Sequence, residues 1–333
     1  MGNNHSLDEI EELTRQALAA HGAAPFAAAE VARAVRVAES YGNRICGLYY
    51  VESYCLQLQT GRVDGAVTPK VSRPRPGLVE VDAGFGFAQP AFSRALVPAV
   101  DAARENGTAT LAVSHAHTCT SLGYFTEQIA KAGLIGIGFT NASPIVAAPG
   151  GKTRVIGTNP IAFSVPDGAG GIAMQFDQST TMVALGKITM AKAMGQPIPL
   201  GWALDHNGEP TTDPDAALKG SLVSIGGYKG WGFGLMAEIL AAGMTGSVLS
   251  REVKPLKSPD GPPHDLGQYY ILIDPDASDA FYKRIAALAE HAAQDEGARM
   301  PGQNRQYMEA VEVADQVWAR LEELAEGPKP VAS

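Results

Sequence analysis

The residues that could do chemistry are concentrated in one short stretch, HAHTCTSLGYF, at positions 115–125. It holds two histidines, one cysteine and several small hydroxyl side chains. His115, His117 and Cys119 are residue types that bind zinc, but an H-x-H-x-C run supplies at most three ligands, and the other cysteines, Cys46 and Cys55, are far away in sequence. The alternatives are a side chain that moves protons or a loop whose hydroxyl groups contact a cofactor. We therefore expect no metal site here.

Regular elements on both sides must position this stretch. TATLAVSHAH (108–117) and GLIGIGFTNAS (133–143) are short apolar runs separated by a helical segment, which predicts a β–α–β unit with parallel strands. The same reasoning predicts further elements along the chain. Strands are expected at 159–166, 171–179 and 268–275, and helices within 7–60, at 230–246, which is apolar enough to be buried, and at 278–294 and 304–325.

The composition of the chain argues against some classes of binding partner. The chain has 333 residues, 45% of them hydrophobic, and a formal net charge of −9 without any cluster of basic residues, which argues against nucleic acid and anionic membranes. No apolar run reaches the roughly 18–20 residues of a membrane span, and the first residues lack the pattern of a signal peptide. Three cysteines cannot form a fully paired disulfide scaffold. We expect a cytoplasmic protein that acts on small molecules.

Glycine-rich stretches suggest phosphate contacts without a standard motif. No G-x-G-x-x-G follows the first strand, and no Walker A, H-E-x-x-H or G-x-S-x-G motif is present. In SIGGYKGWGFG (224–234), however, Lys229 stands between glycines at the start of a helix, where an ammonium and backbone N–H groups could meet phosphate. RVIGTNPIAFSVP (154–166) and ARMPGQNR (298–305) form further turns. Each stretch alone could equally serve chain reversal and packing.

Together and in this order, several of these stretches resemble the type 2 malate/L-lactate dehydrogenase family over nearly the whole chain. The resemblance implies an α/β fold with a non-Rossmann NAD(P)-binding central sheet, flanked by helical N- and C-terminal segments, and a homodimer or higher homo-oligomer. We divide the chain into an N-terminal helical segment (1–75), a central sheet domain (76–250) and a C-terminal segment (251–333). The matching motifs are AGLIGI (132–137) with TN (140–141), GTNPIAF (157–163), GGYKG (226–230), LMAEILAAGMTG (235–246) and R-x-P-G (299–302).

The resemblance also implies which residues contact the cofactor, NADP or NAD. In the family, the loop that matches HTCTSL wraps the dinucleotide. Relatives carry a proton-transfer histidine near this place, which fits His117 with a shift of one residue and Thr118 without it. The cofactor-binding residues expected in this way are His117, Thr118, Cys119, Thr120, Ser121, Leu122, Thr158, Asp177, Gln178, Ser179, Lys229, Arg299, Pro301 and Gly302.

One family motif is altered. A-D-x-x-G-x-D-S-H-G-x-x-R lies without gaps on AESYGNRICGLYY (38–50), so that Asp-Ser-His becomes Arg44, Ile45 and Cys46 and the arginine expected to hold the substrate carboxylate becomes Tyr50. The acidic partner of the Ser-His pair in ketimine reductases falls at Lys187. The Ser-His-Asp relay of the family is therefore replaced.

The replacements give the catalytic candidates. Lys187, Cys46 and His117 could donate a proton if burial and neighbouring charges tune them, and Arg44 or Lys187 could hold a carboxylate beside Tyr50. A cyclic imine is already protonated when ionised and needs less help from an acid. GFAQPA (86–91) also resembles the Δ1-piperideine-2-carboxylate/Δ1-pyrroline-2-carboxylate reductases. We predict an NAD(P)H-dependent reductase of a small 2-oxo acid or cyclic 2-imino acid. The alternative is a dinucleotide-binding homologue that has lost catalysis and acts as a regulatory or structural partner.

Overall fold

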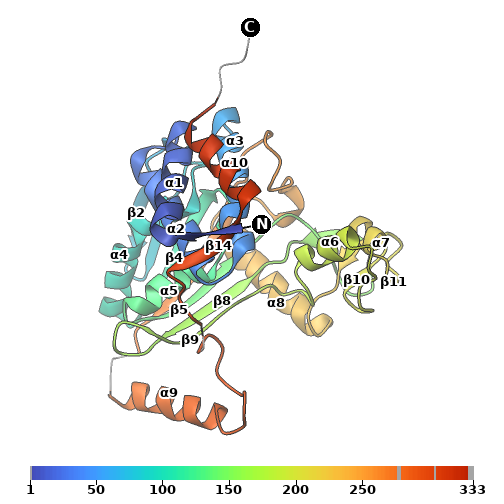
Figure 1. The fold of residues 1–333 in the computed structure, drawn as a ribbon. Coiled ribbons are helices and arrows are strands. Elements are labelled where there is room, and N and C mark those ends of the chain that lie inside the picture. Colours follow the sequence, from blue (N-terminus) through green and yellow to red (C-terminus); the bar gives the residue numbers. More distant parts are fainter. Residues whose placement is uncertain (1, 276–278, 304, 329–333) are drawn as a thin grey trace.

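A seven-stranded mixed sheet forms the centre of the molecule (Figure 1). The structure is a computed structural model and describes residues 2–275, 279–303 and 305–328. The strands follow the order β2-β3-β4-β13-β5-β8-β9 across the sheet. Their bounds are β2 (Lys70–Arg75), β3 (Leu78–Asp82), β4 (Thr108–Ala116), β5 (Ile135–Thr140), β8 (Ile161–Pro166), β9 (Ile172–Gln178) and β13 (Leu266–Ile273).

Strands β4 and β5 are parallel members of one sheet, as the β–α–β prediction requires, but they are not neighbours. The two strands run in the same direction, but β13 lies between them and pairs antiparallel with both. The parallel pair is instead β3 and β4, joined by helix α4 (Ala88–Asn106). Local sequence patterns do not reveal that a strand from the C-terminal part of the chain enters between two earlier ones. The sheet thus contains strands from all three expected divisions of the chain. β2 belongs to the first division, β13 to the third and the other strands to the second.

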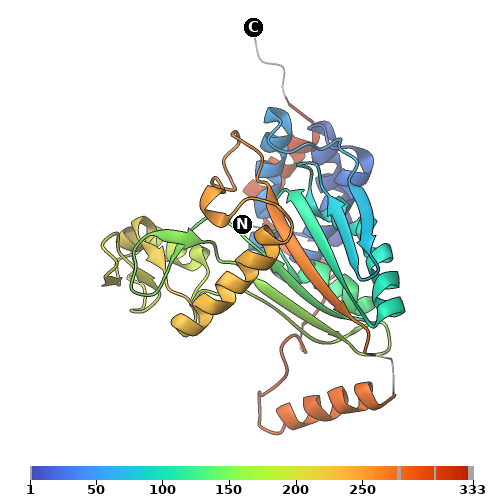
Figure 2. The same cartoon turned by 180° about the vertical axis from the view of Figure 1, so that it is seen from behind.

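Helices α4 and α5 (Gly123–Lys131) cover one face of the sheet. Phe92 of α4 packs edge-on against Phe125 of α5 and Tyr270 of β13, with ring centroids 4.9 and 5.0 Å apart. On the opposite face, which Figure 2 shows, α8 (Tyr228–Glu238) and the π-helical turn η3 (Ile239–Gly243) pack across β13 and β5.

A helical unit adjoins the sheet and is built from both ends of the chain. The side chains of Val311 and Val313 are buried and those of their chain neighbours are exposed, which is the alternation of a β-strand. These residues were expected to begin the last helix, but they form a strand that pairs with the N-terminal strand. The expected helix over 304–325 is therefore wrong at its start, and residue 304 lies outside the described part. The unit contains β1 (Gly2–Ser6), α1 (Leu7–Ala20), α2 (Pro25–Ser40), α3 (Val51–Thr60), β14 (Ala310–Ala314) and α10 (Asp315–Ala325).

A smaller unit with its own apolar core lies to one side, as Figure 1 shows. Its strands follow the order β11-β10-β12-β6-β7. They are only two or three residues long, too short to show a periodic pattern, so this sheet was not expected. Its elements are β6 (Val146–Ala147), β7 (Arg154–Ile156), α6 (Leu185–Ala193), β10 (Ala203–Leu204), β11 (Pro210–Thr211), α7 (Pro214–Lys219) and β12 (Ser221–Leu222).

The segment formed by α8 and η3 exposes apolar side chains. The segment 230–246 was expected to be buried, but Phe233 and Ile239 are 55% and 62% exposed, so that expectation is wrong for one face.

Helix α9 (Asp279–Ala292) lies apart from the sheet in Figure 1 and meets the turn at Gly168 through the ring of Tyr282. Its expected first residue, 278, is outside the described part. Within that part, no helix combines the length and the apolar character needed to cross a membrane.

Candidate functional site

The loop 117–122 is held between β4, which ends at Ala116, and α5, which begins at Gly123. Asp177, near the end of β9, holds the far side of the loop. Its Oδ2 accepts hydrogen bonds from the Gly123 N–H at 2.7 Å and the Ser121 hydroxyl at 3.4 Å. The expected cofactor residues of this loop and of β9 therefore lie side by side.

Thr180 connects the GTNP turn (157–160) to the segment before α8 through hydrogen bonds. The Thr158 carbonyl accepts from both the N–H and the hydroxyl of Thr180, each at 2.9 Å, and the Thr180 carbonyl accepts from the Ile225 N–H at 2.9 Å. Lys229 is exposed on the first turn of α8, after the N-cap Gly227. Ser179 and Lys229 thus belong to the same end of the sheet as Asp177.

The turn at 299–302 packs against β9 as well. The Gln175 N–H donates to the Pro301 carbonyl at 3.0 Å, and a Cβ at Gly302 would lie only 2.9 Å from the Gln175 carbonyl oxygen. Arg299 and Gln178 are exposed beside this contact. β9 and the residues that follow it therefore contact all three groups of expected cofactor residues.

These residues fit a dinucleotide. Hydroxyl groups and the Asp177 carboxylate suit ribose hydroxyls, while Lys229 and the N-terminus of an eleven-residue helix suit phosphate. A Cβ at Gly226 or Gly227 would meet no atom within 4 Å, so the backbone is open to a ligand there.

Cys46 and Tyr50 lie on two short helical turns, η1 (Arg44–Cys46) and η2 (Leu48–Tyr50), next to the loop. Burial raises the pKa of Cys46 to about 12, and the charge of Asp177 adds to the effect. Burial also raises the pKa of Tyr50 to about 12 and raises the pKa of Cys119. All three groups are therefore protonated at neutral pH.

His117 is buried beside these groups. The Tyr54 ring lies between it and Tyr50, at centroid distances of 5.4 Å and 5.7 Å. We call Cys46, Tyr50, Tyr54, His117 and Cys119 the aromatic–thiol cluster. On its other side, His117 stacks on His264 with ring centroids 3.9 Å apart and an interplanar angle of 17°.

Hydrogen bonds determine the tautomer of His117. The Gln57 amide NH2 donates to the carbonyls of Leu256 and Ser258, so Gln57 Oε1 must accept from His117 Nε2, 2.6 Å away. Nε2 therefore carries the proton, and Nδ1 makes no hydrogen bond within the described residues. Burial lowers the pKa of His117 well below 6.5, so the ring is neutral.

The basic catalytic candidates remain exposed. Lys187, on the first turn of α6, and Arg44 make no side-chain hydrogen bond or salt bridge to any described residue. A Cβ at Gly186 would lie 3.5 Å from Ile45, so α6 does begin beside η1. The structure thus brings their elements together, but among the described residues no hydrogen bond or salt bridge links Lys187 to the aromatic–thiol cluster.

His115 has a partner of its own. Its Nδ1 lies 2.7 Å from an Asp265 carboxylate oxygen. Across the described residues, no three or more His, Cys, Asp or Glu side chains form a group that could hold a metal ion. His115, His117 and Cys119 therefore contact different neighbours.

Comparison with known proteins gives the family. The family model for malate/L-lactate dehydrogenase matches residues 5–322. The chain belongs to this family. It is 38% identical to a (2R)-3-sulfolactate dehydrogenase (NADP(+)) of Chromohalobacter salexigens over 90% of each chain. It is 34% identical to a Δ1-pyrroline-2-carboxylate/Δ1-piperideine-2-carboxylate reductase of Pseudomonas syringae pv. tomato over 96% of each.

Solved structures of family members have the same fold. The Δ1-piperideine-2-carboxylate reductase of P. syringae superposes with a TM-score of 0.87 at 32% identity, covering 97% of this chain and 99% of that one. The sulfolactate dehydrogenase of Methanocaldococcus jannaschii gives 0.89 at 27% identity, covering 97% of both. The expected α/β fold of the family is confirmed.

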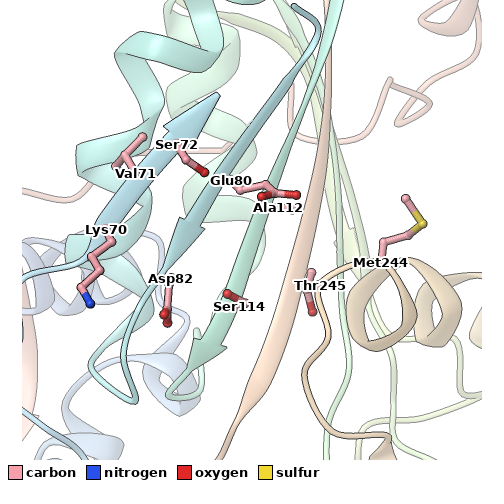
Figure 3. A pocket seen from close by; sticks show the side chains of 9 residues that line it. All are labelled: Lys70, Val71, Ser72, Glu80, Asp82, Ala112, Ser114, Met244 and Thr245. Atoms are coloured by element: carbon pink, nitrogen blue, oxygen red, sulfur yellow. The ribbon is translucent and has the colours of Figure 1, made fainter. Parts of the chain in front are cut away.

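Two cavities have no predicted site residue of this family member in their lining. One, of about 260 Å³, lies on the open face of β2, β3 and β4, where Ser72, Glu80, Ser114 and Thr245 turn towards it (Figure 3). The other, of about 300 Å³, lies between α3 and α10. Lys257 lines its rim.

Sequence reasoning missed several residues around the site. Gln57, His264 and Lys257 reach it from distant segments, and no motif identified them. Arg305 follows the R-x-P-G turn, lies 3.8 Å over the Tyr41 ring and donates to the Gln175 side chain. Its basic charge so close to the turn was the one signal that could have indicated it.

Proposed function

We propose that this protein is an NAD(P)H-dependent oxidoreductase that reduces a small cyclic 2-imino acid or 2-oxo acid, in which the C=N or C=O group is next to a carboxylate. The observation that carries the proposal is the contact of Asp177 with the start of α5, which brings the loop 117–122 and the end of β9 together beside Cys46 and Tyr50. Membership of the family supports the same reaction.

The protonation states favour the imino acid. Hydride transfer to a ketone needs a proton for the developing alkoxide, usually from a group with a pKa near neutrality. Cys46 and Tyr50 have pKa values raised to about 12, and the pKa of His117 is lowered well below 6.5. A protonated cyclic imine brings its own proton, so the aromatic–thiol cluster has less to supply.

The cofactor supplies the hydride when it is bound. On this proposal the hydroxyl groups of Thr118, Thr120 and Ser121 and the Asp177 carboxylate hold its ribose portions. Lys229 and the start of α8 hold phosphate, and the remaining predicted contacts come from Thr158 and the turn at 299–302. NADP is favoured because a named relative uses it.

Location and assembly are part of the proposal. The three cysteines, Cys46, Cys55 and Cys119, are free thiols, which suits the reducing cytoplasm. The exposed apolar face of α8 suits a homodimer or a higher homo-oligomer. The alternative of a homologue without catalysis is not favoured, because the named relatives are enzymes.

The experiment is a substrate panel followed by the absorbance of the reduced nicotinamide. Δ1-pyrroline-2-carboxylate, Δ1-piperideine-2-carboxylate and pyruvate would be reduced with NADPH or NADH, and (2R)-3-sulfolactate would be oxidised with NADP+. We expect kcat/KM to be highest for a cyclic imine. Oxidation of sulfolactate without any imine reduction would contradict the preference, and no turnover with any member of the panel would contradict the proposed function.

A further inference from the structure

The segment 254–264, between η4 (Ser250–Glu252) and β13, is fixed to the region around α3 by side-chain hydrogen bonds. We call this segment the anchored loop. Gln57 donates to two of its carbonyls, and the guanidinium of the buried Arg62 donates to three. The Thr60 hydroxyl donates to a further one at 2.7 Å. The accepting carbonyls belong to Pro255, Leu256, Ser258, Pro259 and Pro262.

Lys257 lies in the middle of this loop and extends to η2. Its Nζ is 3.0 Å from the ring centroid of Tyr49 and 4.7 Å from that of Tyr50. It donates one hydrogen bond, to the Tyr49 carbonyl at 3.2 Å. An ammonium has three N–H donors, and Lys257 makes no salt bridge to any described residue. It can therefore bind an anion without giving up a partner.

The other nearby cations are engaged or face elsewhere. The Arg62 guanidinium is bound to loop carbonyls, and Arg305 lies on Tyr41 beside β9. Lys187 and Arg44 are exposed. Within the described part of the chain, Lys257 is thus the cation that contacts the Tyr50 ring, and Tyr50 belongs to the aromatic–thiol cluster.

We propose that Lys257 binds the carboxylate of the substrate and so determines that the enzyme accepts a 2-imino or 2-oxo carboxylate rather than an uncharged imine or ketone. This inference rests on the proposed function. The rings of Tyr49 and Tyr50 cover one side of the ammonium. Leu48 and Val51 give the adjoining 300 Å³ cavity an apolar part, and its charged lining residues Glu52 and Arg320 are paired with each other. Because the anchored loop is held through its backbone, the position from which the Lys257 side chain extends is set before substrate binds.

The test compares substrates with and without the carboxylate. Lys257→Met should raise KM for Δ1-pyrroline-2-carboxylate roughly 10- to 100-fold and change kcat little, since one charge-assisted hydrogen bond is lost. For Δ1-pyrroline, which lacks the carboxylate, kcat/KM should be the same in both proteins. Lys257→Arg should retain most of the affinity. Lys254→Met, on the same loop and exposed, is the matched control and should behave as the parent protein.

Equal losses on both substrates would mean that Lys257 only supports Tyr49, and would overturn the inference. A second measurement does not depend on turnover. Pyrrole-2-carboxylate is a planar ring that resists hydride transfer, and its dissociation constant from Lys257→Met, measured by calorimetry, should be roughly 10- to 100-fold larger than from the parent protein. Equal affinity would overturn the inference. Lys257-dependent binding without any imine or ketone reduction would instead overturn the proposed function alone.

Discussion

The stacked pair of His117 and His264 makes the folded state sensitive to acid. Burial lowers the pKa of His264 to about 3 and the pKa of His117 well below 6.5, so the folded protein keeps both rings neutral. The unfolded chain binds protons on both as the pH falls below about 6.5. The unfolded state then holds more protons than the folded one, and stability must fall with decreasing pH.

We expect the free energy of unfolding to decrease by about 2–4 kcal/mol between pH 7.5 and pH 5, at up to about 1.4 kcal/mol per pH unit for each histidine. Urea unfolding at several pH values measures this decrease. His264→Phe keeps a flat ring in the stack and removes one titrating group, so its decrease should be about half as large. A stability that does not change over this range would show that the two rings take up protons in the folded state as readily as in the unfolded chain.

Lys229 tests the cofactor contacts. It is exposed on the first turn of α8, where its charge and the helix N-terminus can act on the same phosphate. Lys229→Ala should weaken NADPH binding by about 1.5–3 kcal/mol, the value of one charge-assisted hydrogen bond. Titration by nicotinamide fluorescence measures it. The exposed Lys152→Ala, in the smaller unit, is the control, and equal affinities of the two variants would argue against this phosphate site.

At the scale of elements, local patterns predicted most helices and the strands β4, β5, β8, β9 and β13. They did not predict where β13 inserts, because its position depends on contacts with β4 and β5, which lie far away in the chain. The site shows the same limit. The expected loop 117–122 and Asp177 come together, whereas the anchored loop brings Lys257 and His264 to positions that no local spacing indicates.

The anchored loop also allows a prediction about an element. Arg62 is fully buried, and its guanidinium donates to the carbonyls of three loop residues. Arg62→Met would leave these carbonyls without their donor and should lower the free energy of unfolding by about 2–4 kcal/mol. Urea unfolding tests the loss, and Arg251→Met, at an exposed position, should change stability by no more than about 0.5 kcal/mol. If both variants unfold alike, the carbonyls have found other partners.

At the scale of the whole molecule, the loop 117–122 is largely buried, whereas one apolar helix face is uncovered. Phe233, Met236 and Ile239 recur at three-residue intervals on α8 and η3 and are all exposed, and Met244 extends the same patch. A monomer in water rarely leaves such a continuous apolar surface open. A second copy of the chain that covers this face would remove it from water and would also hold α8, with Lys229 at its start, in place.

We therefore expect a mass of at least twice 34.8 kDa by light scattering at micromolar concentration. Changing Phe233 and Ile239 together to Asp should shift the protein to the monomer, since two charges would be buried in the contact. Reductase activity should fall with it, because α8 carries the predicted phosphate contacts. Val97→Asp is the matched control, since Val97 is 66% exposed on the outer face of α4, away from this patch. A parent protein that is monomeric and active would show that the exposed face of α8 serves another purpose.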